Sequence, residues 1–289
     1  MTSPSMQLGF MAAQRLAPQH LLSRTAGLVA NTSSEPVKNR LIQWFIRRYG
    51  VDMSEAVEPD PRAYASFNAF FTRALRSGTR PLEGDQHTAI APADGVLSQY
   101  GRMRRGRLVQ AKGQSFSAAE LTAESEETIQ GLANGLFATI YLAPRDYHRV
   151  HMPVSGTLEK MTFIPGRLFS VNPVTAARVP RLFARNERVV AWFRTDWGPL
   201  AVVLVGAMIV AGIETVWAGP VAPSGNRPRT LHYSSTGNKA IHLERGDELG
   251  RFHLGSTVIL LLPREKFSPV ADLACGQTLR MGNALAKGS

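Results

Sequence analysis

Residues 197–213 read WGPLAVVLVGAMIVAGI, a run of 17 positions without a charged side chain. A helix that crosses a bilayer needs about 20 such residues, and this run is broken by glycine and proline at positions 198, 199, 206 and 212. Its apolar residues are rich in the β-branched Val and Ile, which favour strands. The stretch therefore predicts two buried strands and no membrane-spanning helix.

Short β-type runs, separated by Gly and Pro, extend on both sides of this stretch from about residue 88. They predict strands over residues 95–100, 135–142, 157–163, 189–193, 202–205 and 257–262. Two segments break the pattern. We expect residues 115–134 to form one helix or helical turn, and residues 219–239, rich in Pro, Ser, Gly and Asn, to form a long loop.

The first 80 or so residues have helical character instead. Apolar residues recur from Met6 to Val29, with a proline interrupting them. Ser34 is a candidate N-cap for a second helix, which Gly50 would end. A third helix is expected from Ser66, and it would present Phe67, Phe70, Phe71 and Leu75. The fold class predicted is therefore α+β, with N-terminal helices followed by a β-rich domain.

The charge balance indicates an anionic partner. Lys and Arg number 33 against 22 Asp and Glu, a formal net charge of +11. Nucleic acid, an acidic lipid surface and an acidic small molecule all fit that charge. The predicted N-terminal helices combine aromatic with basic residues, a combination that suits an interfacial membrane anchor. The basic residues are Arg15, Arg24, Lys38, Arg40, Arg47 and Arg48. Ordinary packing on a core is the alternative, and a transit peptide also suits the basic, acid-free residues 1–34.

Composition sets further limits. The hydrophobic fraction of 44% allows a real core and excludes wholesale disorder. The one cysteine, Cys275, excludes an intrachain disulfide and a cysteine-clustered metal site. We expect this free thiol to fill space in the core.

Four residues could carry chemistry. His148 and His151 lie three apart, and Met152-Pro153 after them favours extended chain, on which they would point opposite ways. No third metal ligand is obvious nearby, so no metal is predicted; a buried structural histidine is the alternative for each. Asp94, in PADG, suits a turn or the orientation of a histidine. Ser256 follows Gly255 directly before a predicted strand and lacks the second glycine of a Gly-x-Ser-x-Gly elbow.

Five ordered blocks carry a family resemblance. They are FNAFFTRALR (67–76) with Arg80-Pro81, APADG (91–95), YLAP (141–144) with DYHRVHMP (146–153), VLVGA (203–207) and LGSTV (254–258). Together they resemble the phosphatidylserine decarboxylases, the pyruvoyl-dependent enzymes of phosphatidylethanolamine synthesis. Residues 1–34 also resemble the membrane-facing helices of the bacterial form. The resemblance implies a helical membrane-associating region over residues 1–80 and a β-rich catalytic domain over residues 81–289.

The first chemistry that the resemblance implies is self-cleavage. His151, oriented by Asp94, would take the proton of the Ser256 hydroxyl, which then attacks the Gly255 carbonyl. Elimination and hydrolysis would leave a pyruvoyl group at position 256, the covalent cofactor. A side chain at Gly255 would crowd the tetrahedral centre. The products would be a large chain, 1–255, and a small chain, 256–289, that remain together as a heterodimer.

The second implied chemistry is decarboxylation of phosphatidylserine to phosphatidylethanolamine, which makes the protein a carboxy-lyase. The pyruvoyl group at Ser256 would form a Schiff base with the substrate amine and serve as the electron sink. His148 would return a proton to the α-carbon or hold the substrate carboxylate. The resemblance implies a peripheral enzyme on the cytoplasmic face of the cell membrane, bound to anionic lipid and not to nucleic acid; a higher oligomer remains open.

Two rival interpretations use the same residues differently. A Ser-His-Asp hydrolase acting on lipids or peptides would keep Ser256 intact. A non-catalytic lipid- or nucleic-acid-binding module would depend on charge and not on Ser256. Only the decarboxylase interpretation predicts two fragments on a denaturing gel.

Overall fold

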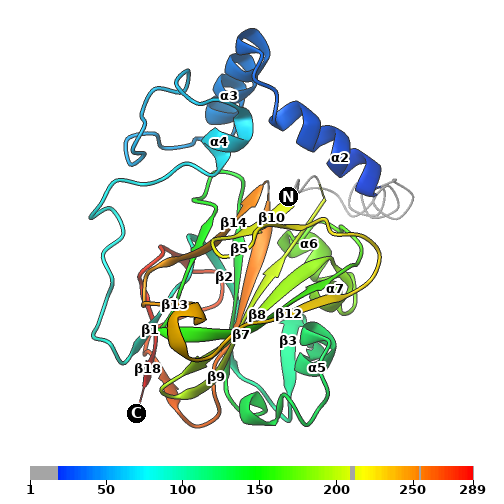
Figure 1. Ribbon diagram of the computed structural model, residues 1–289, viewed down its shortest axis with the longest axis vertical. Helices are drawn as coiled ribbons and strands as arrows, with labels where there is room; N and C mark the ends of the chain where they lie inside the picture. The colour runs from blue at the N-terminus through cyan, green and yellow to red at the C-terminus, as the bar shows by residue number, and fades with distance from the viewer. Residues whose placement is uncertain (1–18, 209–211, 254, 289) are drawn as a thin grey trace.

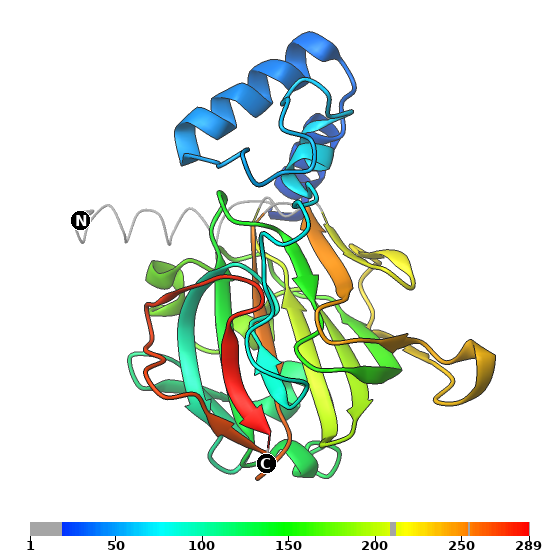
Figure 2. The same ribbon diagram turned by 90° about the vertical axis from the view of Figure 1, so that its left-hand side faces the viewer.

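A layer of helices covers one end of a β-rich body (Figures 1 and 2). The structure, a computed structural model, describes residues 19–208, 212–253 and 255–288. The layer consists of α2 (Gln19–Ala30), α3 (Glu35–Tyr49) and α4 (Phe67–Phe71). The predicted order of helices followed by a β-rich domain is confirmed.

The body is made mostly of strands. They are β1 (Thr88–Ile90), β2 (Gly95–Arg102), β3 (Arg107–Ala111), β4 (Gln114–Ser117), β5 (Leu136–Leu142), β6 (Arg149–His151), β7 (Gly156–Ile164), β8 (Arg188–Thr195), β9 (Gly198–Val205), β10 (Gly212–Thr215), β11 (Gly219–Ala222), β12 (Arg229–His232), β13 (His242–Leu243), β14 (Glu248–His253), β15 (Ser256–Leu261), β16 (Phe267–Pro269), β17 (Thr278–Leu279) and β18 (Ala284–Gly288). Short helices join some of them: α5 (Ala118–Thr122), α6 (Pro173–Ala176), α7 (Leu182–Arg185) and the 3-10 turns η1 (Gln130–Leu132) and η2 (Gly237–Lys239). All six strands predicted from the sequence are present.

Aromatic packing holds the helical layer together. Phe45 of α3 contacts Phe67, Phe70 and Phe71 of α4, with ring centroids 5.0–6.0 Å apart. Helix α3 ends as predicted at Gly50, which adopts the left-handed conformation that glycine tolerates and donates its N–H to Ile46 O. These contacts make α3 and α4 one small core.

Two of the helix predictions need correction. The N-cap position at Ser34 is right, but its side chain makes no capping hydrogen bond. The third helix begins after Ser66 but ends at Phe71, so Leu75 lies beyond it, paired with Ala56 in an isolated bridge. Of the predicted helix over residues 6–29, residues 6–18 lie outside the described residues.

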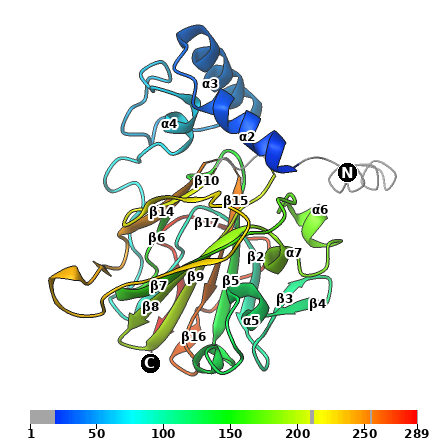
Figure 3. The ribbon, with the colours of Figure 1, turned by 45° about the vertical axis from the view of Figure 1, so that its right-hand side comes forward.

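The largest sheet places the C-terminal part of the chain at its centre. Its hydrogen-bonded order is β12-β7-β8-β9-β15-β5-β2-β17, with β13 paired to β7. Strand β15 lies between β5 and β9, antiparallel to both, and all six of its residues are buried. Figure 3 shows this strand among the long strands beneath the helical layer. A cut just before β15 would therefore leave the new N-terminus held by two ladders of backbone hydrogen bonds.

Each face of this sheet has its own core, because alternate strand residues point to opposite sides. One face packs on two smaller sheets, β11-β10-β14-β6 and β1-β18-β16. The other packs on the hairpin β3–β4 and the short helices α5–α7. Residues of the first core include Ile140, Val202, Leu204, Val258, Ile213 and Leu285; residues of the second include Phe137, Val203, Ile259, Phe116, Leu121 and Phe183.

Two segments differ from the sequence predictions, and a third agrees with them. Residues 115–134 form no single helix: they contain the end of β4, α5 and η1, separated by turns. Residues 219–239 are not a structureless loop, because β11 pairs with β10 and β12 pairs with β7. Composition suggested a helix and a loop in these two segments because it does not encode pairing with distant strands. The stretch 197–213 contains β9 and the start of β10, in agreement with the two strands predicted there, while residues 209–211 lie outside the described residues.

Two single-residue expectations were wrong. Cys275 is exposed, because it lies in a turn before the left-handed Gly276 and not in the core. Lys38 is buried, and its ammonium donates to Arg62 O at 2.8 Å. Lys38 therefore ties α3 to the following loop and is not free for an anionic surface.

Candidate active site

The junction between Gly255 and Ser256 lies at the end of β15 that faces the helical layer. Ser256 is fully buried and pairs with Leu142 of β5. Its Oγ belongs to the buried polar atoms of the described residues that have no hydrogen-bond partner. Such atoms are uncommon in folded proteins, so this hydroxyl is available for a reaction instead of being tied into the sheet.

Gly255 has a backbone requirement. Its φ is +46°, in the left-handed region, and a Cβ built on it would have nothing within 4 Å. We expected a side chain to crowd this position, whereas the space around the intact residue is open. The visible reason for glycine is therefore the backbone conformation.

His148 is the more deeply buried of the two histidines. Its exposure is 0%, and its ring packs on Phe71 of α4 with centroids 4.0 Å apart. Nδ1 lies 2.8 Å from Asp146 O, which can only accept, so Nδ1 carries the proton of the neutral ring. Nε2 is buried without a partner. Burial lowers the pKa of His148 to about 3, so the ring is neutral with a free lone pair on Nε2.

His151 is held on both sides of its ring. It ends β6, the extended segment that the sequence predicted. Nδ1 lies 2.8 Å from Gly246 O, so Nε2 is the acceptor and the Tyr147 hydroxyl donates to it at 3.0 Å. Burial lowers the pKa of His151, while the carboxylates of Glu248 and Asp94 act in the opposite direction.

Asp94 does not hydrogen-bond to His151. Its two oxygens accept from Arg80 Nε at 2.8 Å and Nη2 at 2.6 Å, and one also accepts from Met281 N at 2.8 Å. The expected direct orientation of His151 by Asp94 is thus absent from this structure. The reason is that a bidentate guanidinium already occupies the carboxylate. Asp94 reaches His151 only through its charge.

Arg80 belongs to a chain of ion pairs that sequence reasoning missed. Its Nη2 lies 2.8 Å from Glu55 Oε2, and Glu55 Oε1 lies 2.9 Å from Arg280 Nη2. The chain of ion pairs runs from Asp94 through Arg80 and Glu55 to Arg280, the residue before Met281. The block Arg80-Pro81 was the only signal for it in the sequence, because its partners come from distant segments.

A largely apolar pocket opens onto the junction. Its volume is about 640 Å³, and it lies between the helical layer and the end of the sheet. The helices contribute most of its lining, and the body contributes Pro144, Met208 and Gly255. Phe71 is part of the lining and also packs on the buried His148, whose Nε2 has no partner, so one aromatic ring contacts both the pocket and the histidine. Its helix-side lining includes Leu22, Ala26, Val29, Leu41, Trp44 and Phe67.

The site thus combines a buried serine, a neutral histidine and an apolar pocket. Among the described residues, no group of three or more His, Cys, Asp or Glu side chains could hold a metal ion. Arg149 is engaged by Glu248, with Nη1 to Oε2 at 2.7 Å, and by Thr72 O at 2.9 Å. The arrangement suits nucleophilic attack by Ser256 on the adjacent carbonyl and the binding of a molecule with apolar chains.

Comparisons with known proteins agree with this chemistry. A protein-family model described as "Phosphatidylserine decarboxylase" matches residues 67–287, and one described as "PSD" matches residues 10–50. The chain is 54% identical to the "Phosphatidylserine decarboxylase proenzyme" of Bordetella pertussis (strain Tohama I), over 96% of this chain and 93% of that protein. It is 51% identical to the protein of that name from Marinobacter nauticus, over 96% and 97%, and 54% identical to that of Pseudomonas putida, over 96% and 97%.

Proposed function

The chain belongs to the phosphatidylserine decarboxylase family, and from this membership we propose how its own residues carry out the reaction. The protein is a carboxy-lyase that converts phosphatidylserine to phosphatidylethanolamine with a pyruvoyl group made from one of its serines. Like the proenzymes to which it is similar, it is synthesised as one chain and works as a heterodimer of large and small chains.

The proposed cut lies between Gly255 and Ser256. The Ser256 hydroxyl loses its proton to a base, and its oxygen attacks the carbonyl carbon of Gly255, so the peptide bond becomes an ester and the amine of residue 256 is freed. The buried, unpartnered Oγ and the left-handed Gly255 fit this step and fit a pyruvoyl group at position 256. The small chain 256–289 would then begin in the centre of the sheet.

His151 is the proposed base for the cut. Its Nε2 carries a lone pair that at present accepts from Tyr147, and this contact must be exchanged for the Ser256 proton. Asp94 favours the charged form of His151, which stabilises the protonated base. Arg80 fixes the Asp94 carboxylate, so we assign Arg80 as a positioning residue for the cut.

His148 is the proposed proton carrier of decarboxylation. The pyruvoyl group supplies an electron sink for the electron pair that remains when carbon dioxide leaves. Because burial keeps His148 neutral, it must gain a proton before it can donate one. The substrate ammonium must lose a proton to become a nucleophile; Nε2 would take that proton and later return it to the α-carbon. Burial disfavours the alternative role, in which a charged His148 holds the substrate carboxylate.

The helical layer is the proposed membrane-associating region, with the boundary to the catalytic domain at residues 80 and 81. Exposed large apolar side chains gather on α2 and α3, which carry six of the ten found among the described residues. They are Leu21, Leu22, Leu28, Val29, Val37 and Trp44. In the described part of the chain, no helix is long and apolar enough to cross a membrane. Apolar insertion would therefore hold these helices in the interface of the bilayer.

Positive charge on the helices would direct the protein to an anionic membrane surface. Arg24, Arg40, Arg47 and Arg48 are exposed on the same two helices. Basic residues near an anionic leaflet contribute about 1 kcal/mol each, and the cytoplasmic leaflet carries the anionic lipids. We place the enzyme peripherally on that face, where its phosphatidylserine substrate would enter the apolar pocket from the bilayer.

The observation that carries the proposal is the buried, unpartnered Ser256 Oγ directly after Gly255, which lines an apolar pocket. Its test is formation of phosphatidylethanolamine from phosphatidylserine in detergent micelles. The wild-type protein should form product, and Ser256→Ala should form none. Release of fatty acid by an uncut chain would support a lipid hydrolase instead.

A second measurement tests the membrane part separately. Leu21→Ser with Val37→Ser removes exposed apolar groups from the helices without touching the pocket lining. This variant should co-sediment less with anionic vesicles but keep its turnover in micelles. The matched control is Val109→Ser, an equally exposed valine on the hairpin β3–β4. If the double variant and the control bind vesicles as the wild type does, these helices are not the anchor.

A further inference from the structure

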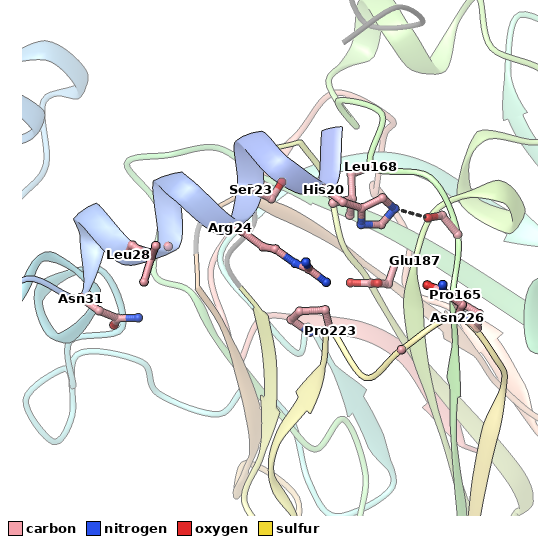
Figure 4. A pocket seen from close by; sticks show the side chains of 13 residues that line it. His20, Ser23, Arg24, Leu28, Asn31, Pro165, Leu168, Glu187, Pro223 and Asn226 are labelled. Carbon is pink, nitrogen blue, oxygen red and sulfur yellow. Dashed lines mark hydrogen bonds between the residues drawn. The ribbon is translucent and has the colours of Figure 1, made fainter. Parts of the chain in front are cut away.

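A second pocket, away from the junction, lies between the other face of α2 and the body. Its volume is about 780 Å³, within the range of roughly 300–1,000 Å³ typical of small-molecule sites. Helix α2 supplies His20 and Arg24 to it, Asn31 directly follows the helix, and the body supplies Glu187 and Asn226. Figure 4 shows these side chains around the hollow. Helix α2 therefore separates an apolar pocket on one side from a polar pocket on the other.

Glu187 is the unusual group of this second pocket. Its exposure is 6%, and it stands directly before β8, with its backbone N–H donating to Arg167 O and its carbonyl accepting from Gly206 N. Within the described residues its carboxyl group has neither an ion pair nor a hydrogen-bond donor. A buried carboxylate without a cation is costly to maintain, so a bound cation would stabilise Glu187. Burial alone raises the pKa of Glu187 to about 7.

The opposite wall carries a positive group. The Arg24 side chain extends from α2 toward Glu187 (Figure 4), but the two charges do not form an ion pair. His20 is fixed at the same wall by its contact with Gly166 O at 3.1 Å. A molecule that fills the space between the two charges must present a cation to Glu187 and an anion to Arg24.

The kind of cation follows from the lining. A carboxylate without donors requires N–H groups, which a primary ammonium has and a quaternary ammonium lacks. Quaternary ammonium groups are bound by aromatic cages, and the described lining contains no Phe, Tyr or Trp. The anion must suit a single guanidinium fork, as a phosphate does. The exposed Leu28 on the rim places the opening beside the apolar face of α2.

We propose that this pocket binds a phosphoethanolamine group, with its ammonium on Glu187 and its phosphate on Arg24, as the headgroup of a membrane lipid that does not react. The inference rests on the proposed docking of α2 at the bilayer. A second, product-like headgroup would hold α2 in place as the shared wall of both pockets. The reaction's own product would then strengthen attachment of the enzyme to the membrane in which it works.

The test uses processed enzyme and vesicles without phosphatidylserine, so that no turnover changes the lipid. Vesicles of phosphatidylcholine and phosphatidylglycerol are compared with vesicles in which part of the phosphatidylcholine is replaced by phosphatidylethanolamine. We expect the replacement to increase binding of the wild type by about tenfold, the order of one charge-assisted hydrogen bond. Glu187→Gln, which keeps the shape of the side chain, and Arg24→Gln should both lose this increase.

Arg40→Gln is the matched control, because it removes one exposed positive charge from α3 outside the pocket. It should lower binding to both vesicle types but keep the increase. Calorimetry with free phosphoethanolamine separates the two sources of the ligand. Binding of the free compound that depends on Glu187, without an increase on vesicles, would assign the site to the soluble molecule.

The proposal is overturned if neither vesicles nor the free compound distinguish Glu187→Gln from wild type. Failure of the proposed function would look different. Wild-type enzyme would then form no phosphatidylethanolamine in micelles, or it would not bind anionic vesicles at all, whereas failure of this inference leaves both intact. Turnover of Glu187→Gln in micelles confirms that the variant is folded.

Discussion

Two polar clusters at the helix-covered end of the sheet differ in how their hydrogen bonds are satisfied. Around Asp94, each charged group has a partner of opposite charge: Arg80 binds both Asp94 and Glu55, and Glu55 also binds Arg280. Around the junction, Ser256 Oγ and His148 Nε2 are both buried without partners. Since buried polar groups are normally satisfied, the second cluster keeps atoms free for partners that arrive during a reaction.

The difference matters because the satisfied cluster crosses the proposed cut. Asp94, Arg80 and Glu55 would belong to the large chain, whereas Arg280 and the Met281 N–H would belong to the small chain. Its bonds hold the two chains together whether or not residues 255 and 256 are joined. In the proposed mechanism the unsatisfied cluster supplies the nucleophile Ser256 and the proton carrier His148, whereas the satisfied cluster supports the base His151 through the charge of Asp94 and joins the two chains.

The largest expected effect comes from the two histidines. His151→Ala should remain one uncut chain without turnover, because the proposed base for the cut is gone. His148→Ala should still cut itself, while its turnover falls by roughly 10²–10⁴-fold, the contribution of a general acid or base. A denaturing gel and the rate of phosphatidylethanolamine formation measure both. An uncut His148→Ala would mean that its free Nε2 takes the Ser256 proton and that the assigned roles are reversed.

A smaller effect is expected from the satisfied cluster. The Arg80 side chain is 9% exposed and that of Arg280 is 59% exposed. Removal of one partner from a buried pair costs roughly 3–5 kcal/mol, so Arg80→Gln should lower the free energy of unfolding by about that amount. Arg280→Gln should lower it by less than about 1 kcal/mol. Urea unfolding of the uncut Ser256→Ala chain measures both; equal losses would contradict the contrast in burial.

The sequence predicted much of the fold but little of this contrast. The strands around Val203 and Val258 follow from apolar runs bounded by glycine, and His148, His151, Asp94 and Ser256 stand in short local motifs. The partners of Asp94, in contrast, stand in no local motif with it. Arg80 lies 14 residues before it and Met281 lies 187 after it, and only the folded sheet brings them together.

Contacts between distant segments also explain other differences between the sequence predictions and the structure. The strands β11 and β12 exist because they pair with distant edges, which composition does not reveal. Glu187 looks in the sequence like any charged residue before a strand. Only the folded chain places it in a pocket that α2, more than a hundred and fifty positions earlier in the chain, lines from the other side.

A variant of Glu187 tests whether an unsatisfied buried group away from the junction lowers the free energy of unfolding. Burial raises its folded pKa from 4.5 to about 7, so its ionisation opposes folding. The penalty is absent below the unfolded value, grows as pH rises from 4.5 to 7, and is complete above 7. Glu187→Gln should therefore stabilise the lipid-free Ser256→Ala chain by about 1–3 kcal/mol at alkaline pH, and by little in acid. Urea unfolding across this range checks it; a gain independent of pH would be inconsistent with burial of the charge.

The smallest expected effect concerns Gly255. A side chain there meets no neighbour, so Gly255→Ala should lose only about 1–2 kcal/mol for the left-handed backbone. Cleavage should be slowed but should go to completion in a time course. Gly95→Ala is the contrasting variant, because its Cβ would fall against the Tyr141 carbonyl oxygen. Complete block of cleavage in a folded Gly255→Ala would instead support crowding at the tetrahedral centre.

The most direct test of the central claim, that the unpartnered Ser256 becomes the pyruvoyl group, is the intact mass of the purified protein. The account predicts two chains, residues 1–255 and 256–289, with the small chain lighter by one ammonia than a peptide that begins with serine. Ser256→Ala should give one full-length mass. Thr139→Val, which removes another buried and unpartnered hydroxyl from the neighbouring strand, should still give two. A wild-type protein that remains one full-length chain while it forms phosphatidylethanolamine would contradict the claim.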